Sequence, residues 1–250
     1  MTLDVRQFSC LTDNYGFLIR DGATGRTACI DTPDAAAVEG ELAIAGWTLD
    51  FIFNTHWHPD HAGGNAALKA RTGATIVGPA EVRRIAPLDR CVCGGDVVML
   101  GETRFDVIET GGHTLGHIAL HDAADHVAFV GDTLFALGCG RLFEGTAEQM
   151  WTSLQRLAAL PDDTRVYCAH EYTAANARFA LSVDSDPAVA ARAEAIFAAR
   201  HRGEPTVPTS IGLEKATNPF LRAPRLSVTP GLPDYEAFAA VRTAKDNFKG

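Results

Sequence analysis

The chain of 250 residues is 46% hydrophobic and carries a formal net charge of −9 at pH 7. This length and apolar content are enough for one large domain, or for one domain with a small appendage. The negative balance argues against a broad nucleic-acid interface, and no apolar run reaches the roughly 18 residues that a membrane span needs. We therefore expect neither nucleic acid nor membrane as a partner, and no protein partner is implied.

The start of the chain and its cysteines predict a cytoplasmic protein. Residues 1–6 (MTLDVR) have neither the apolar core of a signal peptide nor the Arg and Ser bias of a transit peptide. The six cysteines are scattered along a long, core-rich chain. This usage is typical of reduced thiols rather than of a disulfide framework.

The densest group of functional side chains is the heptad THWHPDH at residues 55–61. It follows the apolar run 51–53, which is typical of a buried strand. Because Pro59 disfavours the helical region for the residue before it, we expect an extended segment in which His56, His58 and Asp60 share one face. His61 breaks this alternation and would begin the next turn, where it could serve a second metal ion. A helix is predicted at 65–71.

More potential ligands follow the later strand-like runs. The glycine-flanked loop 110–117 carries His113 and His117. The apolar run 127–130 is followed by Asp132, and the run 166–168 is followed by His170. In α/β proteins, ligand sites gather beyond the carboxyl ends of strands. We therefore expect these side chains to join the heptad.

Together these segments give a set of seven nitrogen and oxygen donors, with His117 as a residue that orients one of them. A closed structural zinc site has four ligands and is usually rich in cysteine. Seven ligands instead suit two divalent ions bridged by Asp132, with a position open for water, which is an arrangement for metal-assisted hydrolysis. Zinc is favoured, although iron and manganese accept the same donors. The predicted ligands are His56, His58, Asp60, His61, His113, Asp132 and His170.

The second part of the sequence is predicted to be helical. Thr146 and Gln149 form a capping-box pattern for a helix that ends by Pro161. Asp186-Pro187 begins a second helix over 188–202. Beyond this second helix the strand-like runs cease and prolines become frequent, and we place a domain boundary near residue 173. A last helix starts near Asp234 and carries Arg242 and Lys245 on one face, which from spacing alone is typical of a solvated basic patch.

The order of these motifs resembles the metallo-β-lactamase superfamily. Within it, several segments are similar to those of glyoxalase II, the hydroxyacylglutathione hydrolase family, and the likeness runs from Cys10 to Lys249. The segments that carry the likeness are 131–135 (GDTLF), 138–146 (GCGRLFEGT), 169–173 (AHEYT) and 215–222 (KATNPFLR).

This resemblance implies an α/β fold, namely an αββα sandwich over residues 1–173, followed by a small C-terminal α-helical domain over 174–250. It implies a glutathione thioester substrate, S-(2-hydroxyacyl)glutathione, which is hydrolysed to a 2-hydroxy acid and glutathione. Asp60 and Asp132 are the predicted catalytic residues, beside their role as ligands. The predicted substrate-binding residues are Arg141, Phe143, Tyr172, Arg242 and Lys245.

Other functions share parts of this pattern. A glutathione persulfide dioxygenase, a lactonase-like hydrolase of the same fold and a non-catalytic module that binds glutathione conjugates remain as alternatives. Arg141 and Phe143 also depart from the Lys and Tyr of several family members, and Phe143 lacks the phenolic hydrogen bond. These departures bear on glutathione affinity rather than on the chemistry.

Overall fold

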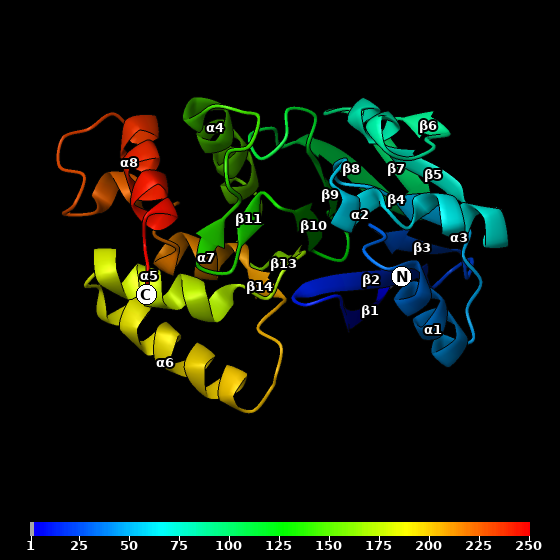
Figure 1. Cartoon of the computed structure of the whole chain (residues 1–250), viewed down its shortest axis with the longest axis horizontal. Coiled ribbons are helices and arrows are strands. Elements are labelled where there is room, and N and C mark those ends of the chain that lie inside the picture. Colours follow the sequence, from blue (N-terminus) through cyan, green and yellow to red (C-terminus); the bar gives the residue numbers. More distant parts are fainter. Residues whose placement is uncertain (1–2) are drawn as a thin grey trace. The chain divides into compact units, whose positions relative to one another are not determined.

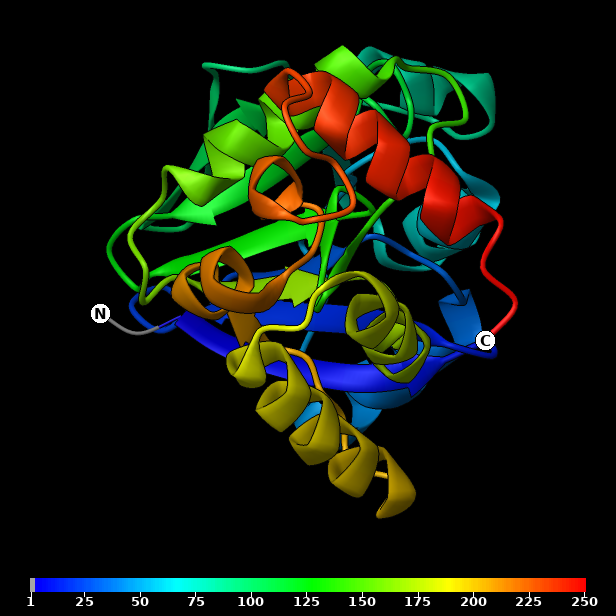
Figure 2. The same cartoon turned by 90° about the vertical axis from the view of Figure 1, so that its left-hand side faces the viewer.

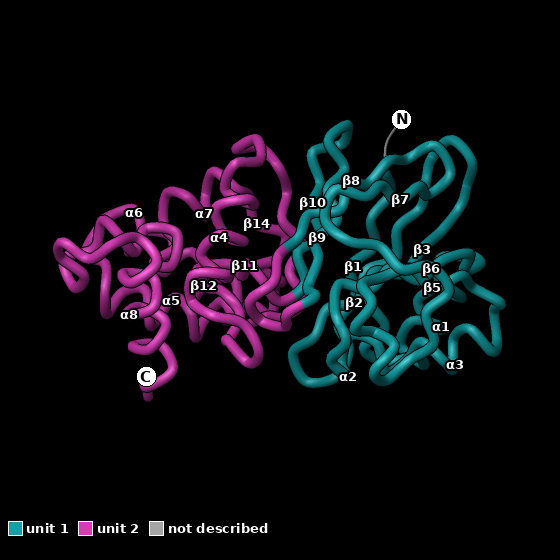
Figure 3. Tube along the Cα trace, turned by 90° about the horizontal axis from the view of Figure 1, so that it is seen from above, with its two compact units in different colours: residues 1–109, 116–131 teal, residues 110–115, 132–250 magenta. Residues whose placement is uncertain are grey.

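The chain divides into two units, which Figure 3 colours separately. The computed structural model describes residues 3–250. Unit 1 comprises residues 1–109 and 116–131, and unit 2 comprises residues 110–115 and 132–250. Among the described residues, no helix is both long enough and apolar enough to cross a bilayer.

The first sheet of unit 1 has six strands in sequence order. The first three strands are antiparallel neighbours, and the pairs from the third to the sixth are parallel. The strands are β1 (Leu3–Cys10), β2 (Asn14–Asp21), β3 (Thr27–Ile30), β4 (Phe51–Phe53), β5 (Thr75–Gly78) and β6 (Arg90–Cys91). The apolar run 51–53 is thus a strand, as predicted.

Helices cover the outer face of this sheet (Figure 1). The helical segments of unit 1 are α1 (Ala35–Ala45), α2 (Pro59–Ala62), α3 (Asn65–Thr72) and the 3₁₀ turn η1 (Ala80–Arg84). Val38 and Leu42 of α1 and Leu68 of α3 pack on Ile52 and Ile76 of the sheet. The predicted helix at 65–71 is confirmed as α3. The expectation of an extended chain through Asp60 is wrong, because α2 already begins at Pro59.

The inner face of the first sheet packs on further strands of unit 1 through phenylalanine rings. These strands are β7 (Val97–Leu100), β8 (Thr103–Glu109), β9 (Ile118–Asp122) and β10 (Val127–Gly131), each antiparallel to its neighbour in the order β10-β9-β8-β7. The Phe129 ring centroid lies 5.7 Å from that of Phe17 and 6.3 Å from that of Phe105. Phe53 lies 6.2 Å from Phe105. The interior of unit 1 is therefore an aromatic core between two sheets.

Unit 2 is mainly helical. Its helical segments are α4 (Ala147–Ala158), α5 (Thr173–Val183), α6 (Pro187–His201), α7 (Ile211–Thr217), η2 (Ala223–Arg225) and α8 (Asp234–Asp246). α5 lies beside α6, and α8 lies beside α4 (Figures 1 and 2). The Phe238 ring of α8 packs on Trp151 of α4 at 6.1 Å and on Phe220 at 6.2 Å.

The start signals read from the sequence of unit 2 are confirmed. Thr146 and Gln149 form a complete capping box at the start of α4, and Asp186 caps α6 with Pro187 in its first turn. The expectation that strands cease beyond the second helix is wrong. The two-residue strand β14 (Thr209–Ser210) lies beyond α6 and pairs with β13 (Arg165–Cys168). Unit 2 also contains a short hairpin, in which β11 (Leu134–Phe135) pairs with β12 (Gly138–Cys139).

We expect Phe129→Ala to lower the free energy of unfolding by about 3–5 kcal/mol, because the change leaves a cavity between the two sheets of unit 1. Urea unfolding followed by circular dichroism measures this loss. Phe143→Ala is the matched control: its side chain is 62% exposed, and we expect a change within about 0.5 kcal/mol. Equal losses in the two variants would contradict the assignment of Phe129 to the core.

Candidate functional site

The ligands predicted from the heptad lie together at the end of β4 in unit 1. His56 Nε2 lies 3.1 Å from His58 Nδ1, and His61 Nε2 lies 3.6 Å from the Oδ2 atom of Asp60. His56 and His61 are buried, whereas His58 and Asp60 are half-buried. Because α2 starts at Pro59, Asp60 and His61 occupy one helical turn rather than opposite faces of a strand.

Asp31, which the sequence did not single out, fixes the orientation of His61. Its Oδ2 atom lies 2.8 Å from His61 Nδ1 and accepts from the Thr55 hydroxyl at 2.7 Å. Its Oδ1 atom accepts from the Thr55 backbone N–H at 2.8 Å. With its Nδ1–H donated to a carboxylate, His61 presents the Nε2 lone pair to a cation. Asp31 has φ = 55°, a conformation that is uncommon outside glycine.

Two more side chains hold the unit 1 ligands. Asn14 donates from Nδ2 to the Oδ2 atom of Asp60 at 3.1 Å. The His117 ring stacks on the His56 ring, with centroids 4.7 Å apart. The sequence predicts His117 as a residue that orients a ligand, and this contact supports that role. Asn14 and Asp31 were missed because each is far from the heptad in sequence.

The other three predicted ligands lie together in unit 2. The Asp132 carboxylate faces two imidazoles: Oδ2 lies 3.3 Å from His113 Nε2, and Oδ1 lies 3.4 Å from His170 Nε2. His113 Nδ1 lies 2.9 Å from the Arg141 carbonyl oxygen. Since a carbonyl only accepts, His113 carries its proton on Nδ1 and keeps the Nε2 lone pair for a cation. One oxygen of the Asp132 carboxylate therefore lies near each imidazole.

The donor set fits divalent metal ions. Every donor is an imidazole nitrogen or a carboxylate oxygen, which suits zinc, iron and manganese. The hydrogen bonds to Asp31 and to the Arg141 carbonyl use Nδ1 of His61 and of His113, so Nε2 is the ring nitrogen that would bind a cation. Both units therefore supply His and Asp groups able to bind metal.

Two of the predicted substrate-binding side chains contact ligand rings. Tyr172 stacks on His170, with centroids 4.6 Å apart and an interplanar angle of 3°. Phe143 meets His113 edge-on at 5.2 Å. Tyr172 is 38% exposed and Phe143 is 62% exposed, so both rings combine a contact to a ligand with an open surface.

Arg242 and Lys245 of α8 have different surroundings, although they are three residues apart. Arg242 is 5% exposed; its Nη1 donates to the Cys139 carbonyl at 3.0 Å, and its Nη2 lies 2.9 Å from Asp246 Oδ1. Lys245 is half-buried and donates from Nζ to the Ala175 carbonyl at 3.0 Å. Spacing predicted that both face solvent, but the structure buries Arg242 and leaves Lys245 as the cation nearer the surface.

The pKa of the Lys245 ammonium is lowered to about 8. Burial is the main cause, because it disfavours the charged form. The positive charges of Arg242, Arg178 and Arg141 add to the effect, and Asp246 opposes it.

The short hairpin β11–β12 leads into residues 140–143 and is held from the C-terminal helices. Asn218 donates from Nδ2 to the carbonyl oxygens of Phe135 at 3.1 Å and Gly138 at 3.0 Å. Asn176 donates to Ala136 O at 3.1 Å. A Cβ atom at Gly140 would lie only 2.0 Å from the backbone oxygen of Asp132, which is a severe clash. Glycine is therefore required at position 140, where this segment passes the backbone of Asp132.

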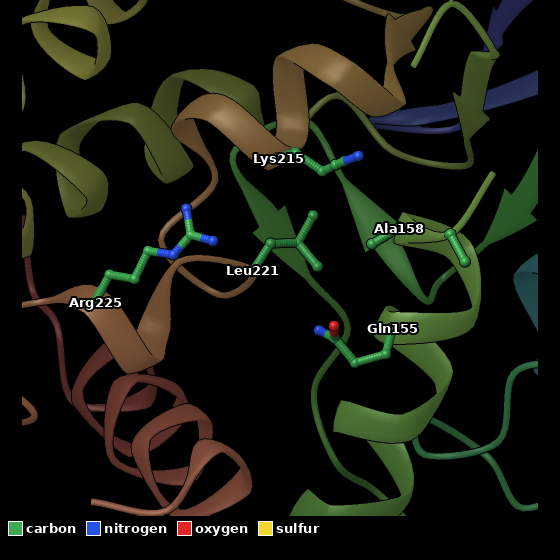
Figure 4. Close-up of a pocket in the computed structure, with 6 residues that line it drawn as sticks. Gln155, Ala158, Lys215, Leu221 and Arg225 are labelled. Carbon is green, nitrogen blue, oxygen red and sulfur yellow. The ribbon is translucent and has the colours of Figure 1, made fainter. Parts of the chain in front are cut away.

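A separate cavity of about 290 Å³ lies in unit 2 (Figure 4). Gln155 and Ala158 of α4 lie on one side of it, and Lys215, Leu221 and Arg225 lie on the other. None of the predicted site residues lines it. Of segment 215–222, Lys215 and Leu221 line this cavity, whereas the buried Asn218 bonds to the hairpin that leads to Arg141.

Comparison with known proteins identifies the family. Residues 16–170 match the metallo-β-lactamase superfamily model, and residues 171–248 match the model of the hydroxyacylglutathione hydrolase C-terminus. A hydroxyacylglutathione hydrolase of Erythrobacter litoralis is 52% identical over 98% of this chain and 100% of its own length. The chain belongs to the hydroxyacylglutathione hydrolase family. A second member, from Maricaulis maris, is 55% identical over 98% of both chains.

Family membership confirms the predicted fold class, a metallo-β-lactamase α/β sandwich with a C-terminal helical domain. The crystal structure of ETHE1 from Myxococcus xanthus is similar, with a TM-score of 0.72 and 30% identity over 98% of this chain and 92% of that one. The two family models meet at residues 170 and 171. The domain boundary at residue 173 and the roles of the individual site residues stay predictions.

We expect Asp31→Asn to lower the affinity for Zn²⁺ about 10–100-fold, because the amide no longer fixes the proton on His61 Nδ1. Competition with a chromophoric chelator measures this affinity. Asp122→Asn is the control, since Asp122 is also a buried carboxylate of unit 1 and is 2% exposed but contacts none of the predicted ligands in the described hydrogen bonds. Equal affinities in wild type and Asp31→Asn would overturn this role.

Proposed function

We propose that the protein hydrolyses S-(2-hydroxyacyl)glutathione, with S-D-lactoylglutathione as a substrate, to a 2-hydroxy acid and glutathione. The observation that carries this proposal is the similarity to hydroxyacylglutathione hydrolases over nearly the whole chain, including the family's C-terminal model. The C-terminal match favours a glutathione thioester over a lactone or a β-lactam. We place the reaction in the cytoplasm, where glutathione is abundant and thiols such as the six of this chain stay reduced.

We further propose that the seven ligands bind two divalent metal ions, with zinc favoured and Asp132 as the bridge. The two oxygens of Asp132, each facing a different imidazole, support this assignment. When bound, such ions supply activated water and polarise the thioester carbonyl.

The protein's own groups then position the reactants. Asp60 accepts a hydrogen bond from Asn14 at 3.1 Å, and we assign to it the acceptance of a proton as water attacks the thioester carbon. The leaving group is a thiolate, and a thiol of ordinary pKa, about 8.5, departs without protonation by a side chain. Arg141, Tyr172 and Lys245 hold the glutathione part, so that the thioester stays over the ligands.

The decisive assay is hydrolysis of S-D-lactoylglutathione, together with a count of bound metal ions. We expect two ions per chain, turnover that is lost with a strong chelator and restored by Zn²⁺, and a loss of at least about 100-fold in kcat for His170→Ala, because the missing ligand disrupts the metal centre. His201→Ala, which removes an exposed imidazole of α6, is the control and should keep full activity. A protein with two bound ions and no thioesterase activity would contradict the proposal, and oxygen uptake with glutathione persulfide would then be measured.

The lowered pKa of Lys245 predicts a pH dependence of substrate affinity. Lys245 is charged below about pH 8 and loses its charge above it, so attraction to the glutathione carboxylates weakens as the pH rises through this value. We expect KM for S-D-lactoylglutathione to increase between pH 7 and 9. A D-lactoyl thioester of N-acetylcysteamine lacks both carboxylates and serves as the reference. A constant ratio of the two KM values over this range would contradict the role of Lys245.

A further inference from the structure

Positive charges gather where α5 and α8 of unit 2 pack together. The Lys245 ammonium of α8 rests on α5: Nζ donates to Ala175 O at 3.0 Å and lies 5.3 Å from the centroid of the Phe179 ring. Arg242 Nη2 of α8 donates to Asp246 Oδ1 of the same helix at 2.9 Å. Lys245 therefore marks the point where the two helices meet.

The cations predicted to bind the glutathione carboxylates are only partly available there. Arg242 is 5% exposed, and its guanidinium bonds to the Cys139 carbonyl and to Asp246. Lys245 is half-buried and already bonded to a backbone carbonyl. Arg141 is exposed. The predicted set thus contains one freely exposed cation for a ligand that carries two carboxylates.

Arg178 supplies a second exposed cation at the same place. It lies on α5, one turn beyond Ala175, so the two residues share a side of the helix. It is exposed, and within residues 3–250 the structure gives its guanidinium no hydrogen bond or ion pair. Its charge also acts on Lys245, where it contributes to the lowered pKa. An excess of positive charge around Lys245, in a chain of net charge −9, points to an anionic ligand.

We propose that Arg178 binds the γ-glutamyl carboxylate of the substrate and is a specificity-determining residue of this enzyme. The inference rests on the proposed function. α5 begins three residues after the ligand His170 and leads away from it, so Arg178 lies roughly 7 Å along the helix axis from Thr173. The γ-glutamyl carboxylate is the one farther from the thioester sulfur, and a planar guanidinium binds a carboxylate through two parallel hydrogen bonds.

The test measures KM and kcat of wild type, Arg178→Ala and Arg178→Lys on four D-lactoyl thioesters. Their thiols are glutathione, glutathione with its glycine carboxylate amidated, N-acetylcysteinylglycine and N-acetylcysteamine. The second keeps only the γ-glutamyl carboxylate, the third only the glycine carboxylate, and the fourth neither. Arg225→Ala is the control, because Arg225 is an exposed arginine of the same unit that lines the cavity of Figure 4.

For Arg178→Ala we expect KM to rise about tenfold on the first two substrates and to stay constant on the others, with kcat unchanged, since one charged hydrogen-bonded contact is lost. Arg178→Lys should recover part of the affinity, and Arg225→Ala should match wild type. Loss of the Arg178 charge should also raise the pKa of Lys245, so that KM begins to increase at a higher pH than in wild type.

Equal KM changes on all four thioesters would show a structural role and overturn the proposal. Unchanged KM on glutathione, or a rise confined to the substrate that keeps the glycine carboxylate, would overturn it as well. Wild-type protein that hydrolyses none of the four would instead count against the proposed function itself.

Discussion

The chemistry of this chain depends on hydrogen bonds that decide which imidazole nitrogen keeps its lone pair. A histidine binds a cation through its deprotonated ring nitrogen. A hydrogen-bond acceptor at the other nitrogen holds the proton there and so determines which nitrogen can bind the cation. In unit 1 the Asp31 carboxylate does this for His61 at 2.8 Å. In unit 2 the Arg141 carbonyl does it for His113 at 2.9 Å. A donor in either place would favour the wrong tautomer.

Arg141 joins two tasks in one residue. Its backbone orients a predicted metal ligand, whereas its exposed side chain is available to a carboxylate of the substrate. Movement of segment 140–143 would therefore disturb the metal site and the substrate site together. This explains why unit 2 holds the preceding hairpin so firmly: Asn218 binds two of its carbonyl oxygens, and Arg242 binds the carbonyl of Cys139. The C-terminal helices thus hold the hairpin that leads to Arg141.

The sequence predicted what is local or periodic. The capping box of α4, the strand before the heptad and the His and Asp groups after strands were all found from short-range patterns. Prediction from the sequence failed where the exposure or role of a side chain depends on tertiary packing. Spacing put Arg242 on an exposed face, but tertiary packing buried it, and Asp31 has no motif around it. Pro59 favours extended backbone at the residue before it, but proline also suits the first turn of a helix, and Asp60 therefore lies in α2.

The net charge of the chain and the charge around Lys245 have opposite signs. A net charge of −9 repels an anionic substrate at long range, but at physiological salt this field is screened beyond about 8 Å. Within that distance the local field is set instead by Lys245 and the neighbouring arginines. The low pKa of Lys245 records the cost of partly burying its charge and, to a lesser degree, of placing it near Arg242, Arg178 and Arg141. A bound carboxylate relieves that cost, because opposite charge favours the protonated amine. An anionic ligand bound there would therefore raise the pKa of Lys245, whereas a neutral thioester would not.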